Sequence, residues 1–250
     1  MEIGAQFYTL RDYTQTLEDF SEAFKKVADI GYKYVQITGG CCQDPEWLKE
    51  QLDKNGLKCV LTHIPATKLI ENPELVAKEH SVIECDNVGL GWYSFDEAKE
   101  ETSFDNFFKT FTPVTEGLHK GGKYFMYHNH FQEFQKRDGK LIIEHIAERF
   151  APEKLGFTLD TYWVQFAGGD PAYWLERLSG RVPCIHLKDY AVGQKMAVIG
   201  EGNINFDRVF QMAEKAGTKY MLVEQDDCYG ENPFDCLRRS YEYLKSRGFE

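Results

Sequence analysis

The sequence of 250 residues contains no apolar run approaching the roughly 18 residues that a membrane-spanning helix needs, so we expect no membrane partner. Its first residues, Met-Glu-Ile-Gly-Ala-Gln, show no basic segment followed by an apolar one, which argues against a secretory signal. The seven cysteines form no CxxC pair and their number is odd, which favours reduced thiols over a disulfide framework. We therefore expect a cytoplasmic location.

Positive charge is also scarce in this sequence. Lys and Arg total 29 against 40 for Asp and Glu, which gives a formal net charge of −11. This balance disfavours binding through a phosphate backbone, and we expect no nucleic acid partner. No GxGxxG follows the first predicted strand, and the chain has neither a GKS/T loop nor an Arg cluster. The sequence thus favours neither a dinucleotide site nor a phosphate handle.

Short apolar runs alternate with longer amphipathic runs along the chain. The apolar runs show little alternation, as buried parallel strands do, and the amphipathic runs show the spacing of helices. The predicted strands are 3–8, 34–37, 57–62, 87–92, 124–127, 155–159, 182–187 and 220–223. The predicted helices are 16–30, 45–55, 73–85, 104–120, 141–150, 171–178, 206–216 and 233–245, and residues 137–140 form a hairpin-type turn. Eight strand–helix units predict one α/β domain over residues 1–250, a single (β/α)8 TIM barrel, ahead of an open doubly wound sheet.

Polar residues close most of these strands, where barrel enzymes place their active groups. Asp160, His186 and Glu224 end three consecutive strands, so their side chains can converge above the barrel axis. One imidazole and two or three carboxylates suit Mn, Zn, Fe or Co, and Mg less well. The alternative is that these residues lie separately in solvated loops, where Asp and Glu are common.

The end of the fifth strand carries His128-Asn129-His130, and the two histidines point to the same side of an extended chain. They could bind metal, act as general acid or base, or donate to sugar hydroxyls, and they could also be hydrogen-bonded histidines beneath a loop. His63 at the third strand end is a weaker candidate of the same kind. Lys188 could stabilise an enolate oxygen or bind an anion, or it could be a surface residue paired with Asp189.

Other candidates lie close to strand ends. Gly200-x-Gly202 precedes a helix and could cradle an anion, although a turn is the simpler interpretation. Gln6 and Arg11 are candidate hydroxyl contacts near the end of the first strand. Aromatic rings that could stack on a sugar face are Trp163, Tyr8, Trp92, Tyr93 and Tyr162.

Several segments together resemble the sugar phosphate isomerase/epimerase superfamily, the xylose isomerase-like TIM barrels. The matching segments span nearly the whole chain, and they are Gln6-Phe-Tyr-Thr-Leu-Arg11, Tyr127-His-Asn-His130 with Glu133-Phe134, Leu159-Asp-Thr-Tyr-Trp163, Ile185-His-Leu-Lys-Asp189, Gly200-Glu-Gly202 and Val223-Glu-Gln-Asp226. The resemblance implies one divalent cation, Mn first and Zn, Co or Mg as alternatives. Its ligands would be Asp160, His186, Glu224 and a first ligand that is either Glu133, which we favour, or His128.

The resemblance also implies chemistry on a small-molecule carbohydrate. The expected enzyme is an isomerase or epimerase, or a related lyase, acting on a sugar or keto-sugar through a metal-stabilised enediolate. Glu224, His130 or His63 would be the base, with Gln6, His128, Trp163 and Lys188 binding substrate. One alternative is a sugar-binding or accessory subunit with a degenerate metal site, and another is an endonuclease-like barrel, which the net charge disfavours. Barrels of this type often form homodimers.

Overall fold

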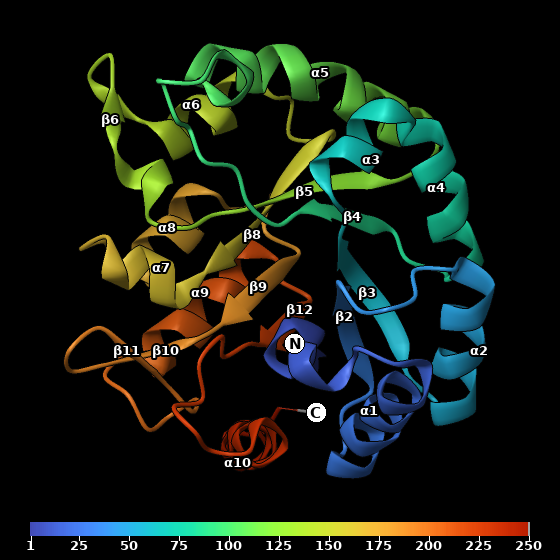
Figure 1. The fold of residues 1–250 in the computed structure, drawn as a ribbon. Helices are drawn as coiled ribbons and strands as arrows, with labels where there is room; N and C mark the ends of the chain where they lie inside the picture. The colour runs from blue at the N-terminus through green and yellow to red at the C-terminus, as the bar shows by residue number, and fades with distance from the viewer. Residues whose placement is uncertain (250) are drawn as a thin grey trace.

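Eight parallel strands close into a barrel that helices surround (Figure 1), in a computed structural model that describes residues 1–249. Around the barrel the order is β1-β12-β9-β8-β5-β4-β3-β2, and β1 pairs with β2 to complete the ring. The barrel strands are β1 Glu2–Gln6, β2 Tyr34–Thr38, β3 Lys58–His63, β4 Asn87–Leu90, β5 Tyr124–His128, β8 Leu155–Asp160, β9 Cys184–Leu187 and β12 Tyr220–Val223. The predicted (β/α)8 barrel is confirmed.

The helices cover the outside of the strands with apolar faces. Local signals define several of them: α2 begins at Pro45 after the Asp44 cap, and Gly56 ends it in the left-handed conformation. The helices are α1 Leu17–Ile30, α2 Pro45–Asn55, α3 Ala66–Glu71, α4 Pro73–Val82, α5 Phe104–Lys120, α6 Ile142–Arg149, α7 Thr161–Phe166, α8 Pro171–Arg177, α9 Phe206–Ala216 and α10 Pro233–Ser246. None of these described helices is long and apolar enough to cross a membrane.

Side chains inside the barrel form two layers that position the site. The lower layer is an apolar cluster, separate from the main core between strands and helices. Its members come from strands spaced around the ring and are Val60, Leu61, Met126, Cys184 and Leu222. Four polar residues form the upper layer, each two positions after a member of the apolar cluster in the chain: His63, His128, His186 and Glu224 follow Leu61, Met126, Cys184 and Leu222. Because alternate residues share a face of a strand, the polar groups lie directly above the apolar layer.

The structure differs from the prediction at several element ends and in added elements. Helix α4 ends at Val82 and not at residue 85, β4 ends at Leu90 and not at residue 92, and β9 begins at Cys184 and not at residue 182. The predicted strand 3–8 ends at Gln6, and a 3₁₀ helix follows over Phe7–Tyr13. The short helices α3 and α7 and the hairpin β10 Asp189–Ala191 with β11 Lys195–Ala197 are additions that the sequence did not indicate. The predicted turn at 137–140 is confirmed, since Lys136–Arg137 (β6) pairs antiparallel with Lys140–Leu141 (β7).

Candidate metal centre and active-site cavity

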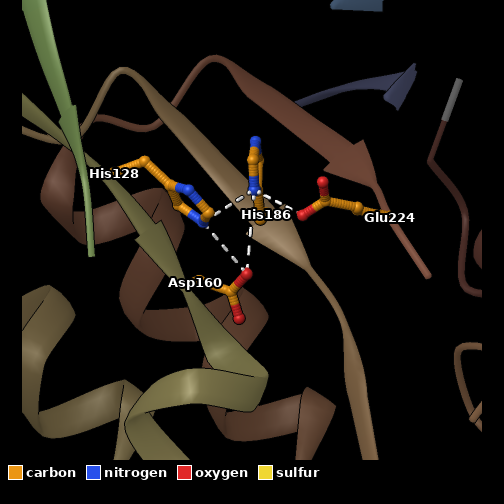
Figure 2. Close-up of side chains that lie close together, drawn as sticks. All are labelled: His128, Asp160, His186 and Glu224. Atoms are coloured by element: carbon orange, nitrogen blue, oxygen red, sulfur yellow. Dashed lines mark hydrogen bonds and ion pairs between the residues drawn. The ribbon is translucent and has the colours of Figure 1, made fainter. Parts of the chain in front are cut away.

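Four buried side chains converge at the carboxyl ends of neighbouring strands (Figure 2). His128 ends β5, Asp160 ends β8, His186 lies in β9 and Glu224 follows β12, and one ligand atom from each lies within 4.8 Å of the others. His128 Nε2 is 3.2 Å from Asp160 Oδ2, and His186 Nδ1 is 2.9 Å from Glu224 Oε2. The predicted convergence of Asp160, His186 and Glu224 is therefore present in the fold, with His128 as the fourth member.

The outer nitrogens of His128 and His186 each face a carbonyl oxygen. His128 Nδ1 is 2.9 Å from the backbone oxygen of Gly91, and His186 Nε2 is 2.6 Å from Gln36 Oε1. Each outer nitrogen can donate its proton to that oxygen, which leaves the inner nitrogens, 3.1 Å apart, as the ones that could offer lone pairs to a bound cation. Two lone pairs and two carboxylates aimed at one point repel each other unless a cation lies between them. Such outer partners are typical of metal-binding histidines.

Lys188 completes the charge pattern of the centre. Its side chain is 1% exposed, and its ammonium lies 3.1 Å from Asp160 Oδ2 and 2.8 Å from Glu224 Oε2. It also contacts both oxygens of Asp226 at 3.0 Å. Three carboxylates and one ammonium leave two negative charges, which a divalent cation would balance. The donor set of two imidazoles and two carboxylates therefore fits such an ion.

The pKa values keep these carboxylates ionised. Burial disfavours their charged forms, but Lys188 and the neighbouring histidines outweigh it and hold the pKa of Asp160 and of Glu224 well below the usual range. Burial also opposes charge on His186, yet Glu224 and Asp160 raise its pKa to about 9. Without another cation, His186 takes up a proton and the carboxylates stay ready to bind a positive charge.

Glu133, which the sequence favoured as the first ligand, is not part of this group. Its carboxylate is fully buried and accepts hydrogen bonds from the Tyr127 hydroxyl at 2.5 Å and the His130 backbone N–H at 2.8 Å. Tyr127 alternates with His128 along β5, so its side chain points to the helix layer and packs against Phe107. Glu133 is therefore held on the helix side of the strand, and His128 is the fourth member of the converging group. Burial raises the pKa of Glu133 to about 7.

A cavity of about 670 Å³ opens above the centre. His63 and His130 line it on either side of His128, with ring centroids 5.1 and 4.6 Å from that ring. His63 Nε2 and His130 Nδ1 are buried and have no partner in residues 1–249. Burial lowers the pKa of His63 well below its usual value and that of His130 to about 2, so both rings are neutral.

Aromatic rings form part of the cavity wall. Trp163 packs beside His130 with ring centroids 5.1 Å apart, and Tyr8 and Trp92 are 40% and 54% exposed. Other predicted contacts lie elsewhere. Gln6 is buried, with its Oε1 accepting from the Tyr8 N–H at 3.1 Å, and Arg11 lies over the Tyr8 ring at 4.8 Å. Neither is among the residues that line the cavity.

The loop around Gly200 and Gly202 does cradle an anion, and the anion is the protein's own Asp189. Its carboxylate accepts from the backbone N–H groups of Gly200 and Gly202, both at 2.9 Å, and of Ile204 at 3.2 Å. The suggested Lys188–Asp189 surface pair is therefore wrong: Lys188 is buried and pairs with other carboxylates.

Two further residues of the site were not among the predicted ones. Gln36 orients His186, and its signal in the sequence was an amide within an apolar strand. Asp226 binds Lys188, and its signal was a second carboxylate two residues after Glu224, on the same side of an extended chain.

A sequence profile of the xylose isomerase-like TIM barrel matches residues 24–247. The chain belongs to this family. The predicted resemblance is thus confirmed over most of the chain.

Curated relatives include inosose dehydratases. That of Bacillus cereus (strain AH820) is 25% identical over 162 residues, covering 54% of this chain and 53% of the relative. That of Mesomycoplasma hyopneumoniae (strain 7448) is 27% identical over 174 residues, covering 59% and 57%. The chain thus spans about half the length of these curated relatives. A sugar phosphate isomerase/epimerase structure from Parabacteroides distasonis ATCC 8503 has a TM-score of 0.81 at 23% identity, covering 98% of this chain and 93% of that one, and shares the fold.

Proposed function

We propose that this chain is a divalent-metal-dependent enzyme that removes a proton next to the carbonyl of a sugar or keto-sugar. Return of the proton to carbon gives isomerisation or epimerisation, and loss of a neighbouring hydroxyl gives dehydration. The observation that carries the proposal is the convergence of two imidazole nitrogens and two carboxylates beneath a cavity of about 670 Å³. The inosose dehydratases among its relatives support dehydration as one outcome.

The proposed ligands are His128, Asp160, His186 and Glu224, with Mn²⁺ first and Zn²⁺, Co²⁺ or Mg²⁺ as alternatives. A bound divalent ion polarises a substrate oxygen and lowers the pKa of the neighbouring C–H. Glu224 serves as a ligand in this proposal and not as the base. Its Oε2 already contacts His186 Nδ1 at 2.9 Å and the Lys188 ammonium at 2.8 Å, so this oxygen is engaged at the centre.

The proton of the substrate is taken up by an imidazole at the cavity wall. His63 and His130 are neutral, and each has a nitrogen without a partner in residues 1–249. Either nitrogen can accept the proton of a substrate C–H placed beside it. Lys188 stays protonated, because three carboxylates outweigh its burial and raise its pKa, and it can donate to the oxygen that gains charge.

The cavity wall suits a carbohydrate. Trp163 has an indole N–H without a partner in the described part of the chain, and its ring can cover the apolar face of a sugar. Tyr8 and Trp92 add exposed rings to the same cavity. Stacking on these rings would leave the sugar hydroxyls facing the polar groups around the centre.

Exchange of substrate hydrogen for deuterium tests the proposal. The chain is stripped with chelator, reloaded with Mn²⁺, Zn²⁺, Co²⁺ or Mg²⁺, and incubated in D₂O with free ketoses, inososes and 3-keto-glycosides. Metal-dependent exchange next to the carbonyl is expected, and Asp160→Asn and His186→Ala should lose both metal and exchange. Metal binding without exchange on any of these compounds would instead favour a sugar-binding or accessory role. Retained exchange in the metal-depleted double variant would rule the proposal out.

A further inference from the structure

The position of Lys188 has a consequence for cation binding that goes beyond the proposed metal site and rests on it. We propose that the Lys188 ammonium competes with the divalent ion for Asp160 and Glu224, and that Asp226 is a positioning residue that draws the ammonium outward when the ion binds. Lys188 thus sets the metal affinity of the site, and Asp226 acts on that affinity through Lys188.

The first support is the choice of oxygens. Lys188 Nζ contacts Asp160 Oδ2 at 3.1 Å and Glu224 Oε2 at 2.8 Å. Those same two oxygens face the ligand histidines, Asp160 Oδ2 at 3.2 Å from His128 Nε2 and Glu224 Oε2 at 2.9 Å from His186 Nδ1. An ammonium and a divalent cation bound to the same buried oxygens repel each other. When the ion binds, the Lys188 ammonium therefore has to move away from Asp160 Oδ2 and Glu224 Oε2, wholly or in part.

The second support is the place to which Lys188 can move. Asp226 offers both carboxylate oxygens at 3.0 Å, and it lines the cavity without being one of the four converging residues. Within residues 1–249, Lys188 is the one charged partner of that carboxylate. A lysine stem has four flexible carbons, so a small shift toward Asp226 keeps the buried ammonium paired. In that position the ammonium stays at the cavity and can meet a substrate oxygen.

A purely additive account predicts something different. If each charge acted on the ion independently, removing Asp226 would weaken metal binding by the same factor whether or not Lys188 is present. If Asp226 acts by holding Lys188 away, its removal matters only when Lys188 is there. A double-mutant cycle separates the two accounts.

The experiment is calorimetric titration of Mn²⁺ into the chelator-stripped full chain. The variants are Lys188→Met, Asp226→Asn and their combination, with Lys195→Met as control because Lys195 is exposed in β11 and its ammonium lies over the Tyr229 ring, 5.3 Å from the ring centroid. We expect Lys188→Met to bind Mn²⁺ roughly tenfold tighter and Asp226→Asn roughly tenfold weaker, within the range of coupling between sites in one protein. The combination should match Lys188→Met, and the control should match the unmodified chain.

The possible outcomes separate this inference from the proposed function. Independent, multiplying effects, or weaker binding in Lys188→Met, would overturn the role of Lys188 and leave the metal site standing. No binding by the unmodified chain together with binding by Lys188→Met would support the competition. No binding by either would overturn the metal site and this inference together. If Lys188→Met does not fold, Lys188→Gln replaces it, and Asp226→Glu should restore the affinity lost in Asp226→Asn.

Discussion

At the scale of single residues, the end of β5 shows how one step along a strand decides which side chain reaches the centre. His128 points into the barrel, and the neighbouring Tyr127 points to the helix layer, where its hydroxyl holds Glu133. Glu133 would offer a carboxylate oxygen to the ion where His128 offers an imidazole nitrogen. The Glu133 carboxylate, however, accepts two hydrogen bonds on the opposite side of the strand. The two candidates for the first ligand are therefore separable by substitution.

We expect His128→Ala to lose metal and Glu133→Gln to keep it. Removing His128 takes away a nitrogen within 3.2 Å of Asp160 Oδ2, whereas the Glu133→Gln substitution leaves all four donor atoms in place. Loss of one ligand should weaken Mn²⁺ binding by more than the roughly 10- to 100-fold that loss of an outer partner costs. Metal content after dialysis, measured by elemental analysis, checks this. Metal loss in Glu133→Gln with retention in His128→Ala would restore Glu133 as the ligand.

Glu133 should also make stability depend on pH. Burial raises its pKa from 4.5 to about 7, so the folded state prefers the neutral acid. The resulting stabilisation is fully present below pH 4.5 and is lost as the pH rises through 7. Relative to Glu133→Gln, the unmodified chain should lose about 3 kcal/mol of unfolding free energy across this window, at roughly 1.4 kcal/mol per pH unit. Urea unfolding of both at pH 4.5 and pH 8 measures it. An equal difference at both pH values would mean that Tyr127 and the His130 N–H keep Glu133 ionised.

At the scale of elements, the loop that joins β11 to α9 is built around a carboxylate. Asp189 accepts hydrogen bonds from the N–H groups of Gly200, Gly202 and Ile204. A Cβ added at Gly202 would lie closer to Asp189 Oδ1 than non-bonded atoms approach. The glycine is thus required by the internal anion and not by a bound phosphate.

Gly202→Ala should therefore cost more stability than a glycine substitution in an open turn. We expect a loss of about 1–3 kcal/mol, the usual cost of forcing extra atoms into packed surroundings. Gly193→Ala is the comparison variant: Gly193 lies in the β10–β11 turn with open space around its Cβ position, so its loss contains the strain of an Ala at φ +79° and no steric contact. Thermal unfolding of both variants and of the unmodified chain makes the comparison. No measurable loss for Gly202→Ala would mean that the loop moves away from the added methyl group without cost.

Elements with local signals were predictable, and those that depend on distant partners were not. The bounds of α2, α5, α9 and β12 match the prediction, since caps, prolines and glycines lie within the same stretch of chain. Helix α7 has the sequence Thr-Tyr-Trp-Val-Gln-Phe, whose β-branched and aromatic residues favour strands. It forms because Asp160 caps it and because Thr161 donates to the Lys188 carbonyl at 2.8 Å. The cap is local, but the contact between Thr161 and Lys188, 27 positions apart, forms only when the barrel is assembled.

At the scale of the whole molecule, closure of the barrel determines the site. The rule that active groups stand at strand ends was enough to predict Asp160, His186 and Glu224 as neighbours. It could not predict that Gln36 binds His186, because the two are 150 positions apart in the chain and meet across the barrel. The pairing of Lys188 with Asp226 also followed only from the structure, because these residues lie beyond β9 and β12, where loop conformation decides which side chains meet.

The four proposed ligands lie in or directly after four of the eight barrel strands. An ion bound to all four connects these strands, so cation binding should stabilise the entire fold. The unfolded chain has no such site, so an ion at about 1,000 times its Kd should add roughly 4 kcal/mol to the unfolding free energy. For a domain of this length, each kcal/mol raises Tm by roughly 2–4 °C, so Mn²⁺ should raise Tm by about 10 °C and chelator should reverse the change. Differential scanning fluorimetry with and without Mn²⁺ measures this, and Asp160→Asn is the control that should not respond. If Mn²⁺ leaves the Tm of the unmodified chain unchanged, Lys188 and a protonated His186 alone neutralise the carboxylates. Both already lie within ion-pair distance of Glu224.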